Sequence, residues 1–119
     1  IFAAGFAETG EAGQQRQAAV ARTAEEAGMA LVGPNCIGLV NFADRVPLTY
    51  EPVAPQASDA VPAVAVLTQS GAMASALRLA LQAKGLAVSH VVSTGNEAVL
   101  TAEDFLAALV EDPHPRAVV

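Results

Sequence analysis

Short apolar runs alternate with longer helix-like segments along most of this chain. The apolar runs are 1–4, 29–32, 37–40, 64–68, 88–93 and 116–119. Each is long enough for a strand and too short for a helix. Helical spacing and stop signals predict helices over about 11–27 and 71–84, and from about 101 to the residue before Pro113. Strands that alternate with helices indicate an α/β fold, in which parallel sheets carry flanking helices.

One stretch breaks this alternation. Neither helical nor strand periodicity continues through it, because it contains the four prolines Pro47, Pro52, Pro55 and Pro62. Proline lacks a backbone N–H and fixes its φ, so it ends helices and disrupts central strands. We therefore expect two structural units, 1–45 and 63–119, joined by a proline-rich linker over 46–62. Each unit should contain its own open, partly parallel sheet.

The composition excludes several classes of function. The 119 residues include 6 basic and 12 acidic ones, and a net charge of −6 repels a nucleic-acid backbone. No run approaches the roughly 20 apolar residues that span a bilayer. We therefore expect neither nucleic acid nor a membrane as a partner. The single cysteine, Cys36, fits a reducing compartment such as the cytoplasm. No residues show metal-ligand spacing, so no metal site is expected.

The segment 66–74 combines an apolar strand, a polar turn and the start of a small-residue helix. A helix start presents unpaired N–H groups and the positive end of the helix dipole. Loops at the carboxyl ends of strands line the ligand crevice of α/β sheets. Ser70, Gly71 and Ala72 would therefore suit a phosphoryl group, although the segment is not a Walker A loop. The alternative, which spacing alone favours, is an ordinary N-cap formed by Ser70.

Two further glycine-containing segments follow predicted strands. Residues 33–38 (Gly-Pro-Asn-Cys-Ile-Gly) are typical of a rigid turn, and no nearby basic residue would activate the thiol of Cys36, which favours a buried, inert cysteine. Residues 93–98 (Ser-Thr-Gly-Asn-Glu-Ala) are either a turn with an exposed acid or a binding loop. His90 lies in a predicted strand and is interpreted as a core or crevice-edge histidine. His114, between two prolines, is expected to be exposed.

Four segments, in this order, resemble the NDP-forming acyl-CoA synthetases, which are relatives of the succinyl-CoA synthetase α subunit. They are Gly-Phe-Ala-Glu-Thr-Gly at 5–10, Gly-Pro-Asn-Cys-Ile-Gly-Leu-Val-Asn at 33–41, Thr-Gln-Ser-Gly-Ala at 68–72 and Ser-Thr-Gly-Asn-Glu-Ala at 93–98. The resemblance covers essentially the whole chain. It implies the end of a Rossmann-like CoA-binding domain over 1–45, followed by the first part of a flavodoxin-like domain over 63–119. The chain would then be an internal piece of a longer protein.

The resemblance implies an acid–thiol ligase that forms acyl-CoA from a small carboxylic acid, CoA and ATP or GTP with Mg²⁺. The implied intermediates are an acyl phosphate and a phosphohistidine. Ser70, Gly71 and Ala72 would hold the phosphoryl group. The other implied site residues are Phe2, Ala3, Ala4, Gly5, Asn35 and Cys36 for CoA, with Thr94, Gly95, Asn96 and Glu97 as a possible substrate-side loop.

The same resemblance places part of the chemistry outside the chain. The family's phosphorylated histidine lies in a loop that would follow Val119, and neither His90 nor His114 matches its position. Nucleotide and Mg²⁺ would bind an ATP-grasp domain or subunit. We therefore expect no catalytic residue in 1–119, no synthetase activity of the isolated chain and an oligomeric full-length protein.

Two other interpretations remain. Many relatives have Ala-Asp where this chain has Ala98-Val99. That departure is compatible with a synthetase-like region that senses CoA or acyl-CoA beside a GNAT-type acetyltransferase. The second alternative is a nucleotide-binding flavodoxin-like domain with no relation to CoA.

Overall fold

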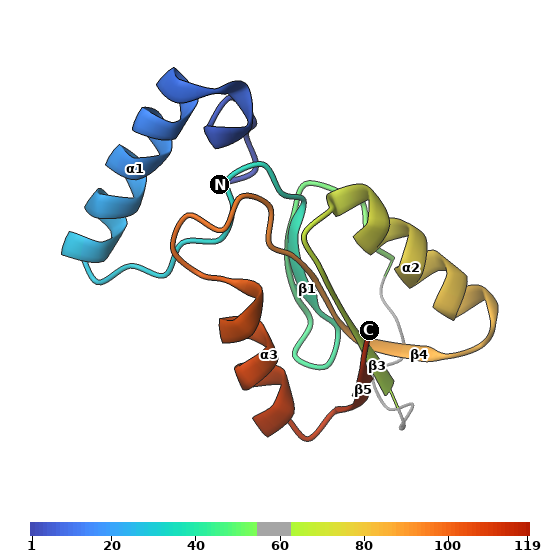
Figure 1. Ribbon diagram of the computed structural model, residues 1–119. Coiled ribbons are helices and arrows are strands. Elements are labelled where there is room, and N and C mark those ends of the chain that lie inside the picture. Colours follow the sequence, from blue (N-terminus) through green and yellow to red (C-terminus); the bar gives the residue numbers. More distant parts are fainter. Residues whose placement is uncertain (55–62) are drawn as a thin grey trace.

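A single mixed β-sheet forms the centre of the computed structural model, which describes residues 1–54 and 63–119 (Figure 1). Within these residues the strands are β1 (Gly38–Asn41), β2 (Val46–Thr49), β3 (Ala63–Thr68), β4 (Ala87–Ser93) and β5 (Pro115–Val118). The helices are η1 (Ala7–Thr9), a 3₁₀ turn, and α1 (Glu11–Glu26), α2 (Gly71–Ala83) and α3 (Ala102–Glu111). The expected α/β fold with flanking helices is confirmed.

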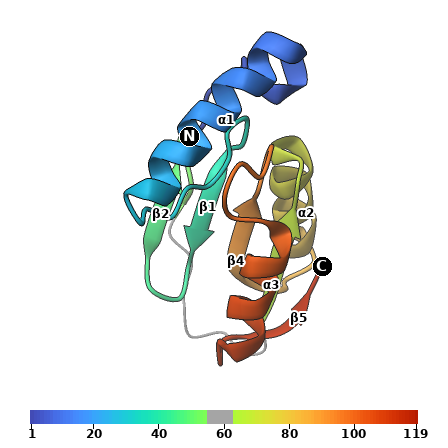
Figure 2. The same ribbon diagram turned by 60° about the vertical axis from the view of Figure 1, so that its left-hand side comes forward.

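The strand order β2-β1-β4-β3-β5 explains where the helices lie. Strands β3, β4 and β5 are parallel, whereas β1 is antiparallel to both of its neighbours. Going from β3 to β4, the chain moves toward β1 in the sheet. Going from β4 to β5, it moves in the opposite direction, past β3. Crossovers of one hand then place their helices on opposite faces. Figure 2 shows this arrangement, with α2 on one side of the strands and α3 on the other.

The core lies mainly between the sheet and α2. Its buried members are Ile37, Val40, Phe42, Val66, Ala74, Val88 and Val91, with Val53, Leu77 and Leu81 packed against them. Ala74 is fully buried in the first turns of α2, where a small side chain lets the helix approach β3 and β4 closely. The abundance of Ala and Val in the sequence thus serves close helix-on-sheet packing.

Two predicted strands are wrong. Residues 1–4 and 29–32 form no strand, and Met29 is 62% exposed. The first segment instead lies along the chain that follows the second: the amino group of Ile1 donates to the Val32 carbonyl (2.6 Å), and the N–H of Asn35 donates to the Ala3 carbonyl (3.0 Å). A strand needs successive ladder hydrogen bonds, and among the described residues these segments make only isolated ones.

The expectation of a separate sheet on each side of the proline-rich stretch is also wrong. Strand β2 lies inside that stretch, and β1 joins β2 to β4, so one sheet continues through residues 38–49 and 63–118. Pro47 is compatible with β2 because an edge strand has one side that needs no ladder partner. Residues 55–62 of the expected linker lie outside the described residues. The division of the chain into two domains stays a prediction.

Helix α1 differs from the other helices because it stands away from the sheet (Figures 1 and 2). Its buried residues are Gly13 and Ala24, and its other side chains are largely polar. No helix in the described residues is long and apolar enough to cross a membrane.

Candidate functional site

Three loops meet at one end of the sheet. Residues 69–70 follow β3, residues 94–101 follow β4, and residues 33–37 precede β1. Gly38 pairs with Ser93, and Ser93 pairs with Thr68, so the start of β1 lies beside the ends of β4 and β3. The sequence therefore predicted the correct place for the turn at 33–38. The predicted reason for this place was a strand before the turn. The structure instead shows an antiparallel strand, β1, after it.

A cavity of about 210 Å³ opens between this turn and the start of α2. Among the described residues it is lined by Phe2, Asn35, Cys36, Ile37, Tyr50, Gly71 and Ala72. The structure thus brings three of the expected CoA residues (Phe2, Asn35 and Cys36) to the same cavity as two of the expected phosphoryl residues. Ala3, Ala4, Gly5, Ser70 and the 94–97 loop are not among the described residues that line it.

Ser70 caps α2, as the simpler interpretation predicts. Its Oγ accepts a hydrogen bond from the N–H of Met73 (3.3 Å), and its carbonyl accepts one from Ala74 (2.9 Å). The N–H groups of Gly71 and Ala72 have no acceptor among the described residues, and both residues line the cavity. The cap and an anion site are therefore compatible. Ser70 satisfies one N–H, and two others remain for a ligand at the positive end of the helix dipole.

Gly71 has a packing role that the sequence does not reveal. A Cβ at this position would lie 2.4 Å from Cγ2 of Ile37. Ile37 belongs to the core, and it directly follows the turn that forms the other wall of the cavity. The absence of a side chain at Gly71 therefore allows the start of α2 to contact that wall.

The turn at 33–36 is held by its neighbours. Gly33 approaches Ile1 so closely that a Cβ would lie 2.4 Å from the Ile1 carbonyl oxygen, and a cis peptide bond joins Gly33 to Pro34. Asn35 adopts a left-handed conformation with φ of 57°, which asparagine tolerates better than most residues. Cys36 is 5% exposed, in agreement with the expectation of a buried thiol. The turn therefore presents Asn35 and Cys36 to the cavity from a fixed backbone.

The loop after β4 is directed mainly toward the protein. Thr94 is fully buried and donates from Oγ1 to the Glu97 carboxylate (2.7 Å). Gly95 has φ of 64°, and a Cβ there would lie 2.2 Å from the Pro34 carbonyl oxygen. The N–H of Asn96 donates to that same carbonyl (2.8 Å). The substrate-side role expected for residues 94–97 stays a prediction.

Tyr50 is a cavity residue that the sequence analysis missed. Its ring lies 5.5 Å from the ring of Phe2 in an edge-to-face arrangement, at 68° between the ring planes. Such pairs are a preferred geometry for aromatic side chains. Tyr50 belongs to the proline-rich stretch that we expected to be a linker, and no local pattern marks it as a site residue.

The two histidines lie away from the cavity. His90 is 8% exposed within β4, and its Nε2 lies 3.8 Å from Oδ2 of Asp112. His114 Nδ1 lies 2.8 Å from the other oxygen of Asp112. Pro115, the next residue, pairs with Ala63 at the opposite end of the sheet from the three loops. Burial lowers the pKa of His90, and the nearby Asp112 opposes this effect. The burial of His90 agrees with its interpretation as a core or crevice-edge histidine.

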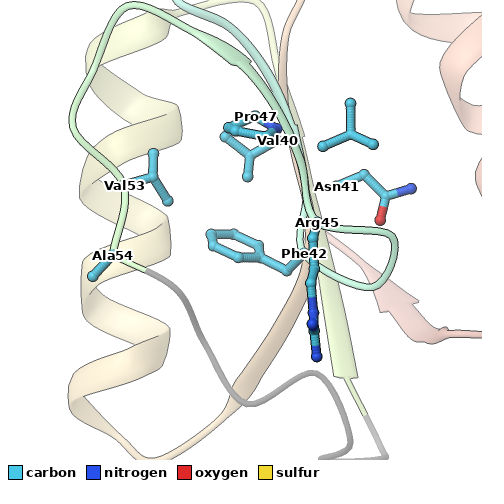
Figure 3. A pocket seen from close by; sticks show the side chains of 8 residues that line it. Val40, Asn41, Phe42, Arg45, Pro47, Val53 and Ala54 are labelled. Carbon is cyan, nitrogen blue, oxygen red and sulfur yellow. The ribbon is translucent and has the colours of Figure 1, made fainter.

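A second cavity, of about 130 Å³, lies between the β1–β2 hairpin and residues 53–54 (Figure 3). Figure 3 shows the Phe42 and Val40 side chains on one side of it and Val53 on the other, next to α2. Its described lining is largely apolar, with Asn41 and Arg45 as the polar members. A ligand site normally adds several convergent polar groups to its apolar walls, and the cavity at the three loops fits that description better.

Parallel strands β3, β4 and β5 with helices on opposite faces, and loops gathered at the carboxyl ends of β3 and β4, define a flavodoxin-like α/β unit. Residues 62–119 match the family described as the succinyl-CoA ligase like flavodoxin domain.

The relatives extend this match beyond residues 62–119. A trans-feruloyl-CoA synthase from an unknown prokaryotic organism is 46% identical over 113 residues, which are 94% of this chain and 16% of the relative. The ADP-forming acetate–CoA ligase I of Archaeoglobus fulgidus is 38% identical over 94% of this chain and 16% of the relative. The chain therefore belongs to the NDP-forming acyl-CoA synthetase family.

A solved structure agrees with this assignment. The dinucleotide-forming acetyl-coenzyme A synthetase 1 of Candidatus Korarchaeum cryptofilum, in complex with phosphate and ADP, superposes with a TM-score of 0.83 at 29% identity. The superposition covers 99% of this chain and 24% of that one. This chain thus spans between one sixth and one quarter of the length of these relatives.

Proposed function

We propose that this chain forms the part of an acid–thiol ligase in which the thiol end of CoA meets the transferring phosphoryl group. One observation carries the proposal: residues expected to touch CoA and residues expected to hold phosphate line the same cavity. They lie 35 to 70 residues apart in the sequence, and the fold brings them together. The full-length enzyme would convert a carboxylic acid, CoA and ATP or GTP into acyl-CoA, orthophosphate and NDP.

The chemistry of the cavity fits this step. In the proposed reaction the thiol sulfur of CoA attacks the carbonyl carbon of an acyl phosphate, the acyl C–O bond breaks and phosphate leaves. The N–H groups of Gly71 and Ala72 are available to bind the phosphoryl oxygens, and preorganised N–H donors stabilise developing negative charge. The chain carries a net charge of −6, but no carboxylate is among the described residues that line the cavity. A phosphoryl group bound there would therefore not be repelled by a carboxylate of this lining.

Two observations bear on the acid. Phe2 and Tyr50 put aromatic rings on the cavity, and one relative is a trans-feruloyl-CoA synthase. Ring-bearing acids are therefore worth comparing with acetate as substrates of the full-length enzyme. The nucleotide and Mg²⁺ are expected on an ATP-grasp domain or subunit, and the relay histidine is expected outside residues 1–119.

The experiment that tests this function uses the full-length enzyme and the substitution Ala72→Asp. Ala72 is exposed in the first turn of α2, where an acidic side chain is favourable for the helix. The same carboxylate would repel a bound phosphoryl group. We expect unchanged or slightly higher thermal stability, together with a fall in autophosphorylation by ATP of about 10²–10³-fold.

Ala72→Asn is the matched control, because it adds nearly the same volume without the charge. It should keep a larger share of the phosphorylation rate. A stable Ala72→Asp enzyme that autophosphorylates at the wild-type rate would leave the start of α2 as a plain capped helix. Absence of acyl-CoA formation by the wild-type enzyme with every acid tested would favour the CoA-sensing alternative.

A further inference from the structure

The side chain of Asn96 connects four segments that are distant in the sequence. Its Nδ2 donates to Oε2 of Glu8 (2.5 Å) and to Oε1 of Gln17 (3.0 Å). Its Oδ1 accepts from Nδ2 of Asn35 (3.3 Å). Asn96 lies in the loop after β4, Glu8 in η1, Gln17 in α1 and Asn35 in the cavity turn. One amide therefore connects the loop after β4 and the cavity turn to η1 and α1.

The hydrogen-bonding capacity of this amide is nearly used up. An asparagine side chain has two N–H donors and one carbonyl oxygen, and both donors of Asn96 are occupied. The backbone of Asn96 is engaged as well, since its N–H donates to Pro34 (2.8 Å) and its carbonyl accepts from Nε2 of Gln17 (3.4 Å). A ligand could reach only what remains on Oδ1. This geometry indicates an internal role and not direct substrate binding.

Glu8 extends the connection to the segment expected to touch CoA. Its Oε1 accepts from the backbone N–H groups of Gly5 (2.5 Å) and Phe6 (3.1 Å). Arg16, the charged group that faces this loop from α1, donates to the Gly5 carbonyl from Nη2 (2.6 Å) and Nε (3.0 Å). The Gly5 end of the 2–5 segment is thus held by a carboxylate that Asn96 contacts, whereas Ala3 is bonded directly to the N–H of Asn35.

We propose that Asn96 is a positioning residue for CoA, which holds the Gly5 end of the 2–5 segment in place relative to Asn35 through its bonds to Glu8 and Asn35. This inference rests on the proposed function, because the CoA residues are assigned by family resemblance. Loops that are already in place need not be ordered when the ligand binds, and preorganisation of this kind increases affinity. The phosphoryl-binding end of α2 is not part of the Asn96 network, so phosphoryl transfer should not depend on Asn96.

The charge state of Glu8 favours its hydrogen bond to Asn96. Hydrogen bonding to Asn96, with smaller contributions from the backbone N–H groups of Gly5 and Phe6, lowers the pKa of Glu8 to about 2. Glu8 is therefore a carboxylate at any pH at which an enzyme of this kind is assayed. The bond from Asn96 is charge-assisted and shorter than a neutral amide bond.

The test uses the full-length enzyme with the substitution Asn96→Asp. This change keeps the shape of the side chain but places a second carboxylate against Glu8. We expect the KM and the calorimetric Kd for CoA to rise about 10-fold or more, because the Gly5 end of the 2–5 segment loses its fixed position. Autophosphorylation by ATP should stay within about twofold of the wild type.

A second substitution provides the rescue. In the double variant Glu8→Gln with Asn96→Asp, the new amide can donate to the new carboxylate, so the bond reforms with donor and acceptor exchanged. We expect CoA affinity to return toward that of the wild type. Glu11→Gln is the control, because it removes a carboxylate from the first turn of α1, outside the Asn96 network.

The outcomes separate the inference from the function on which it rests. Wild-type CoA affinity in the Asn96→Asp enzyme would overturn the inference and leave the proposed function intact. A parallel loss of CoA affinity and autophosphorylation, without rescue by the double variant, would show general destabilisation and also overturn it. Absence of CoA binding by the wild-type enzyme would overturn the proposed function, and the inference with it.

Discussion

Gly71 has both a ligand-facing role and a packing role. Gly71 lines the cavity and also leaves the space that Cγ2 of Ile37 fills. A large residue at Gly71 would therefore disturb packing as well as any bound phosphate. Ala72 is exposed, so a charge introduced there acts on a bound phosphate without disturbing the packing against Ile37.

His90 gives the first prediction at this scale. Burial lowers its pKa from 6.5; the charged groups around it are Asp112 and His114 beyond α3, and Asp44 in the turn after β1. A histidine whose pKa is lowered in the folded state contributes stability above its unfolded pKa, and this contribution is lost as the pH falls below about 6.5. We expect the free energy of unfolding to decrease between pH 7 and pH 5.

The variant His90→Phe should lose much of this slope, because the titrating group is gone. His114→Phe, at the half-buried position beside Asp112, is the comparison and should retain most of the slope, because His114 affects the pKa of His90 less than burial does. Urea unfolding at several pH values measures both. An unchanged slope in His90→Phe would mean that another group causes the pH dependence.

The sequence predicted several single residues correctly. The capping of α2 by Ser70, which was one of two interpretations of that segment, and the burial of Cys36 and His90 follow from local pattern and residue type. Tyr50 could not be predicted, because its place on the cavity depends on the β1–β2 hairpin folding back beside the 2–5 segment. The hydrogen-bond network of Asn96 could not be predicted either, because its partners lie 61 to 88 residues away in the sequence and no local pattern indicates them.

At the scale of elements, helix starts were easier to predict than strands. The residues Thr-Ala-Glu-Asp at 101–104 predict a capped helix, and the N–H of Thr101 donates to Oδ2 of Asp104 (2.9 Å). By contrast, residues 1–4 and 29–32 are apolar enough for strands but lack ladder partners among the described residues. The sequence does not predict strand β2, because proline breaks central strands, and nothing local shows that β2 lies at an edge, where Pro47 is tolerated.

The cap of α3 gives the second prediction. Backbone and side-chain hydrogen bonds from Thr101 lower the pKa of Asp104. A carboxylate whose pKa is lowered on folding contributes stability above its unfolded pKa, near 3.8, and loses that contribution as the pH falls further. Asp104→Asn should therefore destabilise the protein at pH 7 and converge with the wild type in acid.

Thr101→Ala removes the other member of this cap, and such substitutions cost about 0.5–2 kcal/mol. Glu103→Gln is the control, since it removes a charge from the same turn but keeps the bond between Thr101 and Asp104. Thermal unfolding at pH 7 and pH 3 measures all three variants. Equal destabilisation by Asp104→Asn and Glu103→Gln would mean that the loss of stability comes from the helix dipole and not from the bond between Thr101 and Asp104.

For the whole molecule, the third prediction concerns the isolated 119-residue chain. The sequence has two histidines, and the structure places both away from the cavity. The chain therefore has no histidine that could relay a phosphoryl group at the site. We expect no acyl-CoA formation above background from acid, ATP and CoA, measured by thiol consumption. Turnover by the chain alone would show that the relay has been assigned wrongly.

The continuity of the sheet determines how the cavity can operate. Residues 35–37 lead directly into β1, residues 71–72 follow β3, and β4 pairs with both strands. The strands that carry the two walls are thus two strand spacings apart, about 10 Å, within one continuous sheet, and we expect the walls to move as one rigid body. The cavity is expected neither to open nor to close around its substrates. Under the proposed function, the group that carries the phosphoryl would be the part that moves, toward a cavity of constant width.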